Sequence, residues 1–210
     1  MPRKKRPLDR DSGRVRDASL LVIASEDQFA LKNYFQRFRT RRVQFVVLPT
    51  DDSRSSPKHV VDRLDSFKRD FDLGDGDQLW FCGDRDHWTE SSHAQTFHEV
   101  LNHCQREGYR VALSNPCFEL WLLLHFADFF APIGDFRCSD IVLQLRTLAG
   151  GYNKRNGLVQ EVTEEMVLGA VRRAKALDTN DERIPGHPMT RVYLILEELI
   201  KREAIKFAPR

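Results

Sequence analysis

Four short apolar runs, separated by segments with helical spacing, are the feature that most restricts the fold of this chain. The runs lie at residues 20–24, 43–48, 79–82 and 109–113. Each run has the length of a buried strand, whereas the segments between them repeat apolar residues three and four positions apart. Strands that alternate with helices form a mainly parallel sheet with helices on both faces. The sequence therefore predicts an α/β core with a sheet of about four strands.

Helical periodicity and helix-end signals place the helices. We expect them at about residues 31–38, 57–67, 91–107, 117–127, 139–148, 163–177 and 188–203. The helix after the last strand is predicted to begin at Asn115, a good capping residue, with Pro116 in its first turn. The chain then divides into a flexible basic tail at 1–17, an α/β core at 18–130, and a helical C-terminal region at 131–210 that packs on the core.

Charge is unevenly distributed along the chain. The formal net charge is only +2, from 33 basic and 31 acidic residues, yet basic side chains crowd the tail, among them Lys4, Lys5 and Arg6. Such a cluster attracts phosphates, so these residues are predicted to bind nucleic acid. The alternative is a solvated tail without a ligand.

Membrane contact and compartment are also constrained by the sequence. No run of 18 apolar residues occurs, so no membrane-spanning segment is expected. The four cysteines form no CxxC pair and lie in or beside apolar stretches. They are therefore predicted to be buried thiols rather than zinc ligands. We expect a cytoplasmic protein.

Acidic residues follow the predicted strands. Glu26 and Asp27 come after the first strand, Asp84 and Asp86 after the third, and Glu119 after the fourth. Ligands of open parallel sheets bind beyond the carboxyl ends of the strands, so these side chains are expected at one edge. Asp84 and Asp86 lie two positions apart and would repel each other unless a cation lay between them. Carboxylate oxygens suit Mg²⁺ or Mn²⁺.

A structural explanation remains open for part of this pattern. Asp and Asn are common after strands because they favour turns and helix caps. Asn115 has both interpretations: a cap alone, or a cap on a helix end that also offers N–H groups to a phosphate. His87 is an auxiliary candidate beside the acidic pair. His125, within the apolar run 118–126, is interpreted as a satisfied core histidine.

Several stretches resemble the RloB-like family. The longest is Ser114–Phe126, and Asp84-Arg85-Asp86, Gly151–Lys154 and Pro188–Val192 are similar to other parts of that family, as are residues 21–26 with 33–35. The resemblance covers nearly the whole chain after the basic tail. It departs from the family pattern at Asp27, where the family usually has a glycine.

The resemblance implies a toprim-related fold and chemistry. Toprim domains carry a glutamate after the first strand and an Asp-x-Asp motif after the third, which makes Glu26, Asp84 and Asp86 the implied catalytic and metal-binding residues. Arg85 and Lys154 would then orient the nucleic acid. The implied function is a Mg²⁺- or Mn²⁺-dependent nuclease for DNA or RNA, with tRNA as one substrate candidate, acting as the effector of a bacterial anti-phage defence system.

Two other functions stay open. The chain is alternatively a non-catalytic, nucleic-acid-binding or regulatory subunit of an ABC-type (OLD-like) ATPase complex, or a toprim protein with another chemistry. Asp27 either adds a ligand or disturbs the metal, and Glu119 is a further auxiliary group. No GxxxxGK[ST] motif occurs, so ATP chemistry would come from a separate ATPase partner. A second copy of the chain is the other partner considered, because Leu194 and Ile200 lie off the apolar stripe of the last helix.

Overall fold

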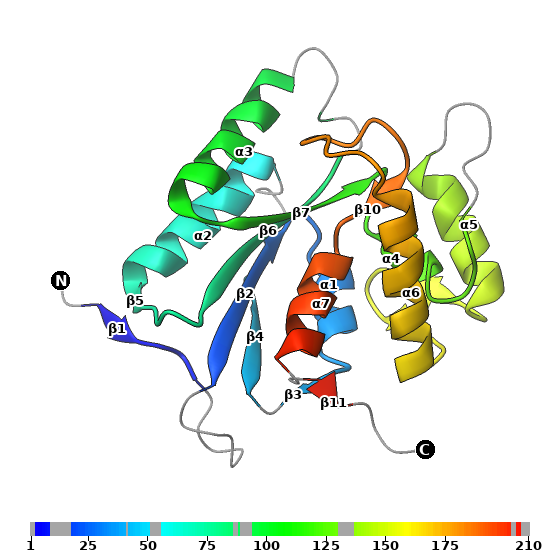
Figure 1. Ribbon diagram of the computed structural model, residues 1–210, viewed down its shortest axis with the longest axis horizontal. Helices are drawn as coiled ribbons and strands as arrows, with labels where there is room; N and C mark the ends of the chain where they lie inside the picture. Colours follow the sequence, from blue (N-terminus) through cyan, green and yellow to red (C-terminus); the bar gives the residue numbers. More distant parts are fainter. Residues whose placement is uncertain are drawn as a thin grey trace.

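A computed structural model of the 210-residue chain describes residues 3–8, 18–40, 42–50, 56–85, 88, 94–129, 137–202 and 205–206. The central strands are β2 (Ser19–Ser25), β4 (Val43–Val47), β6 (Gln78–Asp84), β7 (Arg110–Asn115) and β10 (Met189–Thr190). They form one five-stranded sheet in the order β10-β7-β6-β2-β4 (Figure 1). Four strands are parallel, and β10 is antiparallel to β7. The predicted α/β fold with a mainly parallel sheet is confirmed.

Helices cover both faces of this sheet (Figure 1). They are α1 (Ala30–Phe35), α2 (Pro57–Asp70), α3 (Ala94–Glu107), α4 (Glu119–Leu123), α5 (Cys138–Leu148), α6 (Glu164–Leu177) and α7 (Tyr193–Lys201). Three further pairs of short strands lie outside the central sheet in the described part of the chain. They are β1 (Lys4–Lys5) with β5 (Phe71–Asp72), β3 (Arg39–Thr40) with β11 (Ile205–Lys206), and β8 (Tyr152–Asn153) with β9 (Gly157–Leu158).

Alternate residues of each central strand enter two separate hydrophobic clusters. In β2, Leu20 and Val22 pack with α2 and α3, whereas Leu21 and Ile23 pack with the remaining helices. A strand that is covered on both faces alternates in this way and carries apolar residues at every position. Burial on both faces therefore explains why the strands are continuous apolar runs in the sequence.

The chain reverses its direction across the sheet between β2 and β6. From β2 it crosses to β4 through α1 on one face. From β4 it returns past β2 to β6 and then to β7, through α2 and α3 on the other face. The segments that leave β2 and β6 therefore diverge to opposite faces at the carboxyl edge. In open parallel sheets this switch point is where ligands bind.

Two predictions of local structure after β7 were wrong. The helix expected at 117–127 is shorter: α4 ends at Leu123, and its cap is Phe118 rather than Asn115, which is the last residue of β7. The helix expected at 188–203 is preceded by β10, and α7 begins only at Tyr193. The reason is that β10 hydrogen-bonds to the edge of β7, opposite Ser114 and Asn115, which takes that segment out of the helix.

The cysteine prediction was wrong for two residues. Cys82 and Cys104 are buried free thiols, as expected. Cys117 and Cys138 instead form a disulfide that joins the segment before α4 to the first residue of α5. The two residues are 21 positions apart in the sequence, and the packing of α5 against α4 brings them together.

Part of the segment predicted as a flexible tail is paired. β1 runs parallel to β5, and Nη1 of Arg6 lies 3.3 Å from Oδ1 of Asp77. Residues 9–17 lie outside the described part of the chain.

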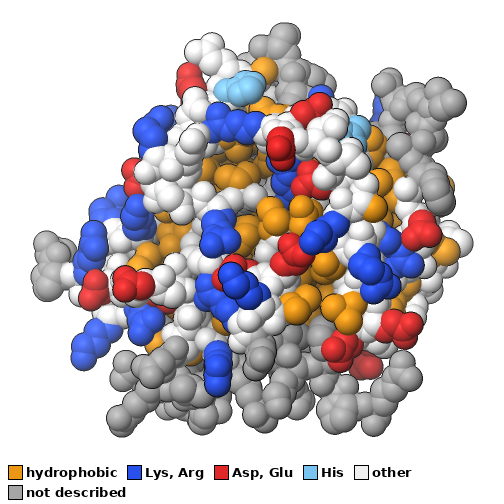
Figure 2. All heavy atoms as spheres, in the orientation of Figure 1, with side chains coloured by type: hydrophobic (Ala, Val, Ile, Leu, Met, Phe, Trp, Pro, Cys, Tyr) orange, Lys and Arg blue, Asp and Glu red, His pale blue; other side chains and the backbone are white. Residues whose placement is uncertain are grey.

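None of the helices in the described ranges has the length and apolar character that a membrane crossing requires. On the face seen in Figure 2, basic and acidic side chains are interspersed with exposed hydrophobic ones.

Candidate functional site

Glu26 and Asp84 line one pocket at the switch point between β2 and β6. Asp84 is the last residue of β6, and Glu26 directly follows β2. Both contribute to the pocket wall, together with Asp27. Two of the three residues predicted to hold a metal are therefore brought together. The third, Asp86, lies outside the described residues, as does His87.

Burial and neighbouring negative charge raise the pKa of Asp84 well above its usual value. Burial is the largest cause, followed by the charges of Glu119 and Glu26. Asp27 acts in the same direction, whereas Lys154 opposes the rise. A carboxyl group in such surroundings holds its proton more tightly than in water, and a cation beside it would favour its charged form. A group of carboxylates that perturb one another in a pocket is typical of a functional site.

Glu26 is oriented by an aromatic side chain that the sequence analysis did not single out. Nε1 of Trp88 donates a hydrogen bond of 2.7 Å to Oε2 of Glu26. This bond links the segment after β6 to the segment after β2. No sequence signal marks Trp88, because an indole N–H reveals its acceptor only in the folded chain.

Asp27 has a structural role at the start of α1. Its Oδ1 accepts hydrogen bonds from the backbone N–H groups of Phe29, at 2.7 Å, and of Ala30. These bonds satisfy N–H groups that have no partner within the first turn of a helix. Its Oδ2 lies 3.6 Å from Nζ of Lys154. Asp27 thus caps the start of α1 and forms an ion pair with Lys154. Its role as a metal ligand stays a prediction.

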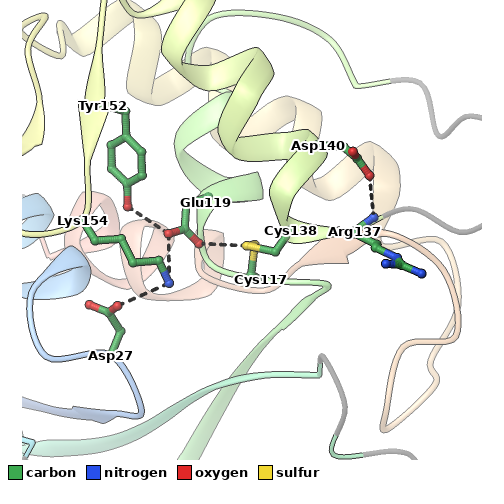
Figure 3. The surroundings of a disulfide bond; sticks show 8 residues. All are labelled: Asp27, Cys117, Glu119, Arg137, Cys138, Asp140, Tyr152 and Lys154. Carbon is green, nitrogen blue, oxygen red and sulfur yellow. Dashed lines mark hydrogen bonds and ion pairs between the residues drawn. A yellow bond between two sulfur atoms is a disulfide. The ribbon is translucent and has the colours of Figure 1, made fainter. Parts of the chain in front are cut away.

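Glu119 is a buried carboxylate that holds two side chains of the β8–β9 hairpin (Figure 3). Tyr152 donates a hydrogen bond of 3.0 Å to its Oε1, and Nζ of Lys154 lies 3.3 Å from the same oxygen. Burial and the charge of Glu119 raise the pKa of Tyr152, so its hydroxyl remains a donor. Burial acts to lower the pKa of Lys154, but the charges of Glu119, Asp27 and Asp84 and the hydrogen bond to Glu119 together outweigh it and raise the pKa. Lys154 is therefore a held positive charge beside the pocket.

Contacts with α1 fix the hairpin that carries Lys154. Nδ2 of Asn33 donates to the carbonyl oxygens of Lys154, at 3.2 Å, and of Arg155, at 2.9 Å. Gly157 has a φ of +78°, and a Cβ added there would lie 3.3 Å from Cβ of Asn33. A glycine at this position therefore permits the close approach. Asn33 and the Gly151–Lys154 stretch, which are far apart in the sequence, form one structural unit.

Arg85 and Asn115 hold the segment before β10. Nη1 of Arg85 donates to the carbonyl oxygen of Gly186 at 3.0 Å. Nδ2 of Asn115 donates to the carbonyl oxygens of Pro185, at 3.1 Å, and of His187, at 2.9 Å. The capping role predicted for Asn115 was wrong, and the contacts of both residues with nucleic acid stay predictions.

His125 is a neutral core histidine. Its Nδ1 lies 2.9 Å from the carbonyl oxygen of Trp121, and its Nε2 lies 3.0 Å from the hydroxyl of Tyr34. Because a carbonyl only accepts, Nδ1 carries the proton and Nε2 accepts from the tyrosine. Burial lowers the pKa of His125 to about 4. The interpretation as a satisfied core residue is confirmed.

Lys4, Lys5 and Arg6 lie at the opposite edge of the sheet from the pocket. Asp77 shows this placement, because it contacts Arg6 and also accepts a hydrogen bond of 2.8 Å from the N–H of Leu20. Leu20 is near the start of β2, whereas the pocket lies beyond the end of that strand. Lys4 and Lys5 are exposed. A nucleic acid that reached both regions would have to extend across the molecule.

Neutralising this basic segment, as Lys4→Ala with Lys5→Ala, should weaken binding of duplex DNA. Each lost phosphate contact should flatten the log–log dependence of affinity on salt by about 0.9. Fluorescence anisotropy over a series of salt concentrations measures the slope, with Lys201→Ala on α7 as the control. An unchanged slope would assign β1 to contacts within the protein alone.

The pocket offers the type of ligand atom that a hard divalent cation prefers. Glu26 and Asp84 offer carboxylate oxygens, which Mg²⁺ and Mn²⁺ prefer, and burial together with the charges of Glu119 and Glu26 raises the pKa of Asp84. Cys117, Glu119 and Cys138 also lie close enough together to form a ligand group. The disulfide, however, leaves no thiolate for a metal there. The metal site expected at Glu26, Asp84 and Asp86 stays a prediction, because Asp86 lies outside the described residues.

The sequence matches one protein family. A family model for RloB-like proteins matches residues 21–199, which is most of the chain. No curated protein and no solved structure gives a significant match. The matched range contains Glu26, Asp84, Glu119 and Lys154, so the carboxylate pocket and the lysine beside it lie within the family region.

Proposed function

The chain belongs to the RloB-like protein family. Because it also has an acidic pocket at the switch point of its sheet, we propose that it is a metal-dependent nuclease. The observation that carries the proposal is the meeting of Glu26 and Asp84 at the switch point of the sheet. Burial and the surrounding carboxylates raise the pKa of Asp84, as expected of a site that receives a cation. A toprim-related chemistry, with Asp86 as a further ligand, fits this arrangement.

In this mechanism Glu26 and Asp84 would hold Mg²⁺ or Mn²⁺ near the scissile phosphate. The bound ion would stabilise the negative charge of the transition state and lower the pKa of a water nucleophile. The N–H of Trp88 keeps Glu26 oriented, which suits that carboxylate to bind the metal or to act as general acid and base. Lys154, held by Glu119, supplies positive charge for a phosphate oxygen beside the pocket.

The proposed substrate is DNA or RNA, with tRNA among the RNA candidates, and the proposed setting is bacterial anti-phage defence in the cytoplasm. A separate ABC-type (OLD-like) ATPase is the proposed partner, because the sequence carries carboxylates predicted to bind a metal but no phosphate-binding GxxxxGK[ST] loop for ATP. Co-purification of the two proteins, followed by an ATP-dependent change in cleavage rate, would support the partnership.

A cleavage assay with defined substrates tests the proposed function. Purified protein is incubated with plasmid, single-stranded DNA and total tRNA, each with Mn²⁺, with Mg²⁺ and with a chelator. Metal-dependent cleavage that falls by about 10²–10⁴-fold in Glu26→Gln supports the proposal, because a general acid or base contributes that much. Asp75→Asn, in the exposed turn before β6, is the control. Cleavage that persists in the chelator, or an unaffected Glu26→Gln variant, would contradict the proposal.

A non-catalytic binding subunit is the second candidate. The ion pairs of Lys154 with Asp27 and Glu119 favour it, because a lysine that neutralises part of the carboxylate charge reduces the attraction for a metal. Such a protein would bind nucleic acid and cleave none of the substrates with either metal. Removing the positive charge, as Lys154→Met, should then strengthen Mn²⁺ binding in calorimetry without producing cleavage.

A further inference from the structure

The disulfide between Cys117 and Cys138 lies directly against the carboxylate that holds Lys154 (Figure 3). Sγ of Cys138 is 3.5 Å from Oε2 of Glu119. This contact contains no proton, because a disulfide sulfur has none to donate. The other oxygen of Glu119 holds Lys154 and Tyr152. One buried carboxylate thus contacts a reducible bond on one side and, on the other, the lysine beside the pocket.

We propose that this disulfide is a redox-sensitive control of the acidic pocket, which acts through Glu119 on Lys154. Control of cleavage by this disulfide rests on the proposed nuclease function. The effect of the disulfide on Glu119 and Lys154 does not depend on that function. Two molecules of a monothiol such as glutathione supply two electrons and two protons. The S–S bond breaks, Cys117 and Cys138 become thiols, and the two reductant molecules join as a disulfide.

Reduction changes the surroundings of Glu119 in two ways. The thiol of Cys138 gains a proton that it can donate to Oε2, which withdraws part of the negative charge that attracts Lys154. Two non-bonded atoms also pack at about 3.5–4 Å, farther apart than a bonded pair, so a sulfur must move. Glu119 is 1% exposed and Cys117 is 3% exposed, so a shift of the Cys117 sulfur presses on packed neighbours. Cys138 is half-buried, and a shift of its sulfur changes its 3.5 Å contact with Glu119 directly.

The rest of the fold should survive reduction. Ile141 and Leu145 anchor α5 in the same hydrophobic cluster as α4, and both are fully buried. The two helices therefore stay together without the covalent bond, and the change is confined to the contact between the sulfurs and Glu119. A local change that leaves the core intact is what a reversible control needs.

Thiol counting and lysine labelling test the proposal on the whole protein, equilibrated with oxidised or with reduced glutathione. After denaturation, we expect two free thiols in the oxidised protein, Cys82 and Cys104, and all four cysteines free in the reduced protein. Mass spectrometry then follows acylation of Lys154 by an amine reagent in the folded protein. Its rate should be about two- to fivefold higher in the reduced protein, the range that weakening a partly exposed ion pair produces.

Variants separate this effect from general thiol chemistry. In the double variant Cys117→Ser with Cys138→Ser, Lys154 should be labelled under both conditions as fast as in the reduced wild-type protein. In Cys104→Ser, the labelling of Lys154 should depend on glutathione as it does in the wild type. Four free thiols in the oxidised protein, or equal labelling of Lys154 in the two wild-type forms, would overturn the proposal whether or not the serine pair folds. Redox-dependent labelling in a protein that cuts nothing would support this coupling and contradict the nuclease. Redox-independent labelling in an active nuclease would do the reverse.

Discussion

Replacing Asp84 with asparagine should abolish metal-dependent cleavage and leave the protein folded. The variant loses a carboxylate from the pocket at the end of β6, where it is proposed to hold the cation. Removing one electrostatic group that stabilises a transition state lowers kcat by about 10²–10³-fold, and loss of the metal adds to that. Initial rates with saturating Mn²⁺ measure the effect, with Asp75→Asn as the matched control. A variant that still cuts at the wild-type rate would place the active site elsewhere.

The same substitution should raise the stability of the metal-free protein at neutral pH. The pKa of Asp84 is higher in the folded protein than in the unfolded chain, so the folded state binds more protons at pH values between the two. The contribution of Asp84 to stability therefore falls as the pH rises from its unfolded pKa of about 3.9. Asparagine has no proton to lose. We expect equal melting temperatures in acid and a higher one for Asp84→Asn at neutral pH, and the opposite order there would contradict the raised pKa.

Added metal should reverse that order. An ion that binds only the folded state stabilises it by about 2.7 kcal/mol when its concentration is a hundred times Kd. The melting temperature of the wild-type protein should therefore rise when Mn²⁺ is added, whereas that of Asp84→Asn should rise little. Equal gains in the two proteins would show that Mn²⁺ binds at a different site.

Replacing Trp121 with alanine should lower the free energy of unfolding by about 3–5 kcal/mol. The side chain is fully buried in α4, with ring centroids 6.0 Å from Tyr34 and 4.9 Å from His125. The cavity would form beside α4, the helix that carries Glu119, so the ion pair between Glu119 and Lys154 should weaken as well.

Urea unfolding followed by circular dichroism measures this change, provided that the dependence on denaturant stays the same. Leu143→Ala on α5 is the control, because that side chain is 67% exposed and its loss should cost within about 0.5 kcal/mol. A loss of less than about 1 kcal/mol for Trp121→Ala would mean that the core closes over the missing ring.

The four parallel strands and most helices could be predicted, because their burial gives the sequence a regular spacing of apolar residues. α5 and α6 begin or end within a residue of the predicted 139–148 and 163–177, since each buries one stripe of apolar residues against the core. β10 could not be predicted. It has only two residues, and its strand conformation depends on an edge of β7 that lies far away in the sequence.

The sequence by itself determined the α/β architecture and which carboxylates follow which strand, because strand and helix periods and the order of elements are local properties. From these it followed that Glu26 and Asp84 would share the carboxyl edge. Only the tertiary structure decided which side chains meet there: Trp88 with Glu26, Lys154 with Glu119, and Cys138 with Cys117. Such contacts depend on how complete elements pack against one another, and a single hydrogen bond, ion pair or disulfide leaves no period in the sequence that could reveal its partner.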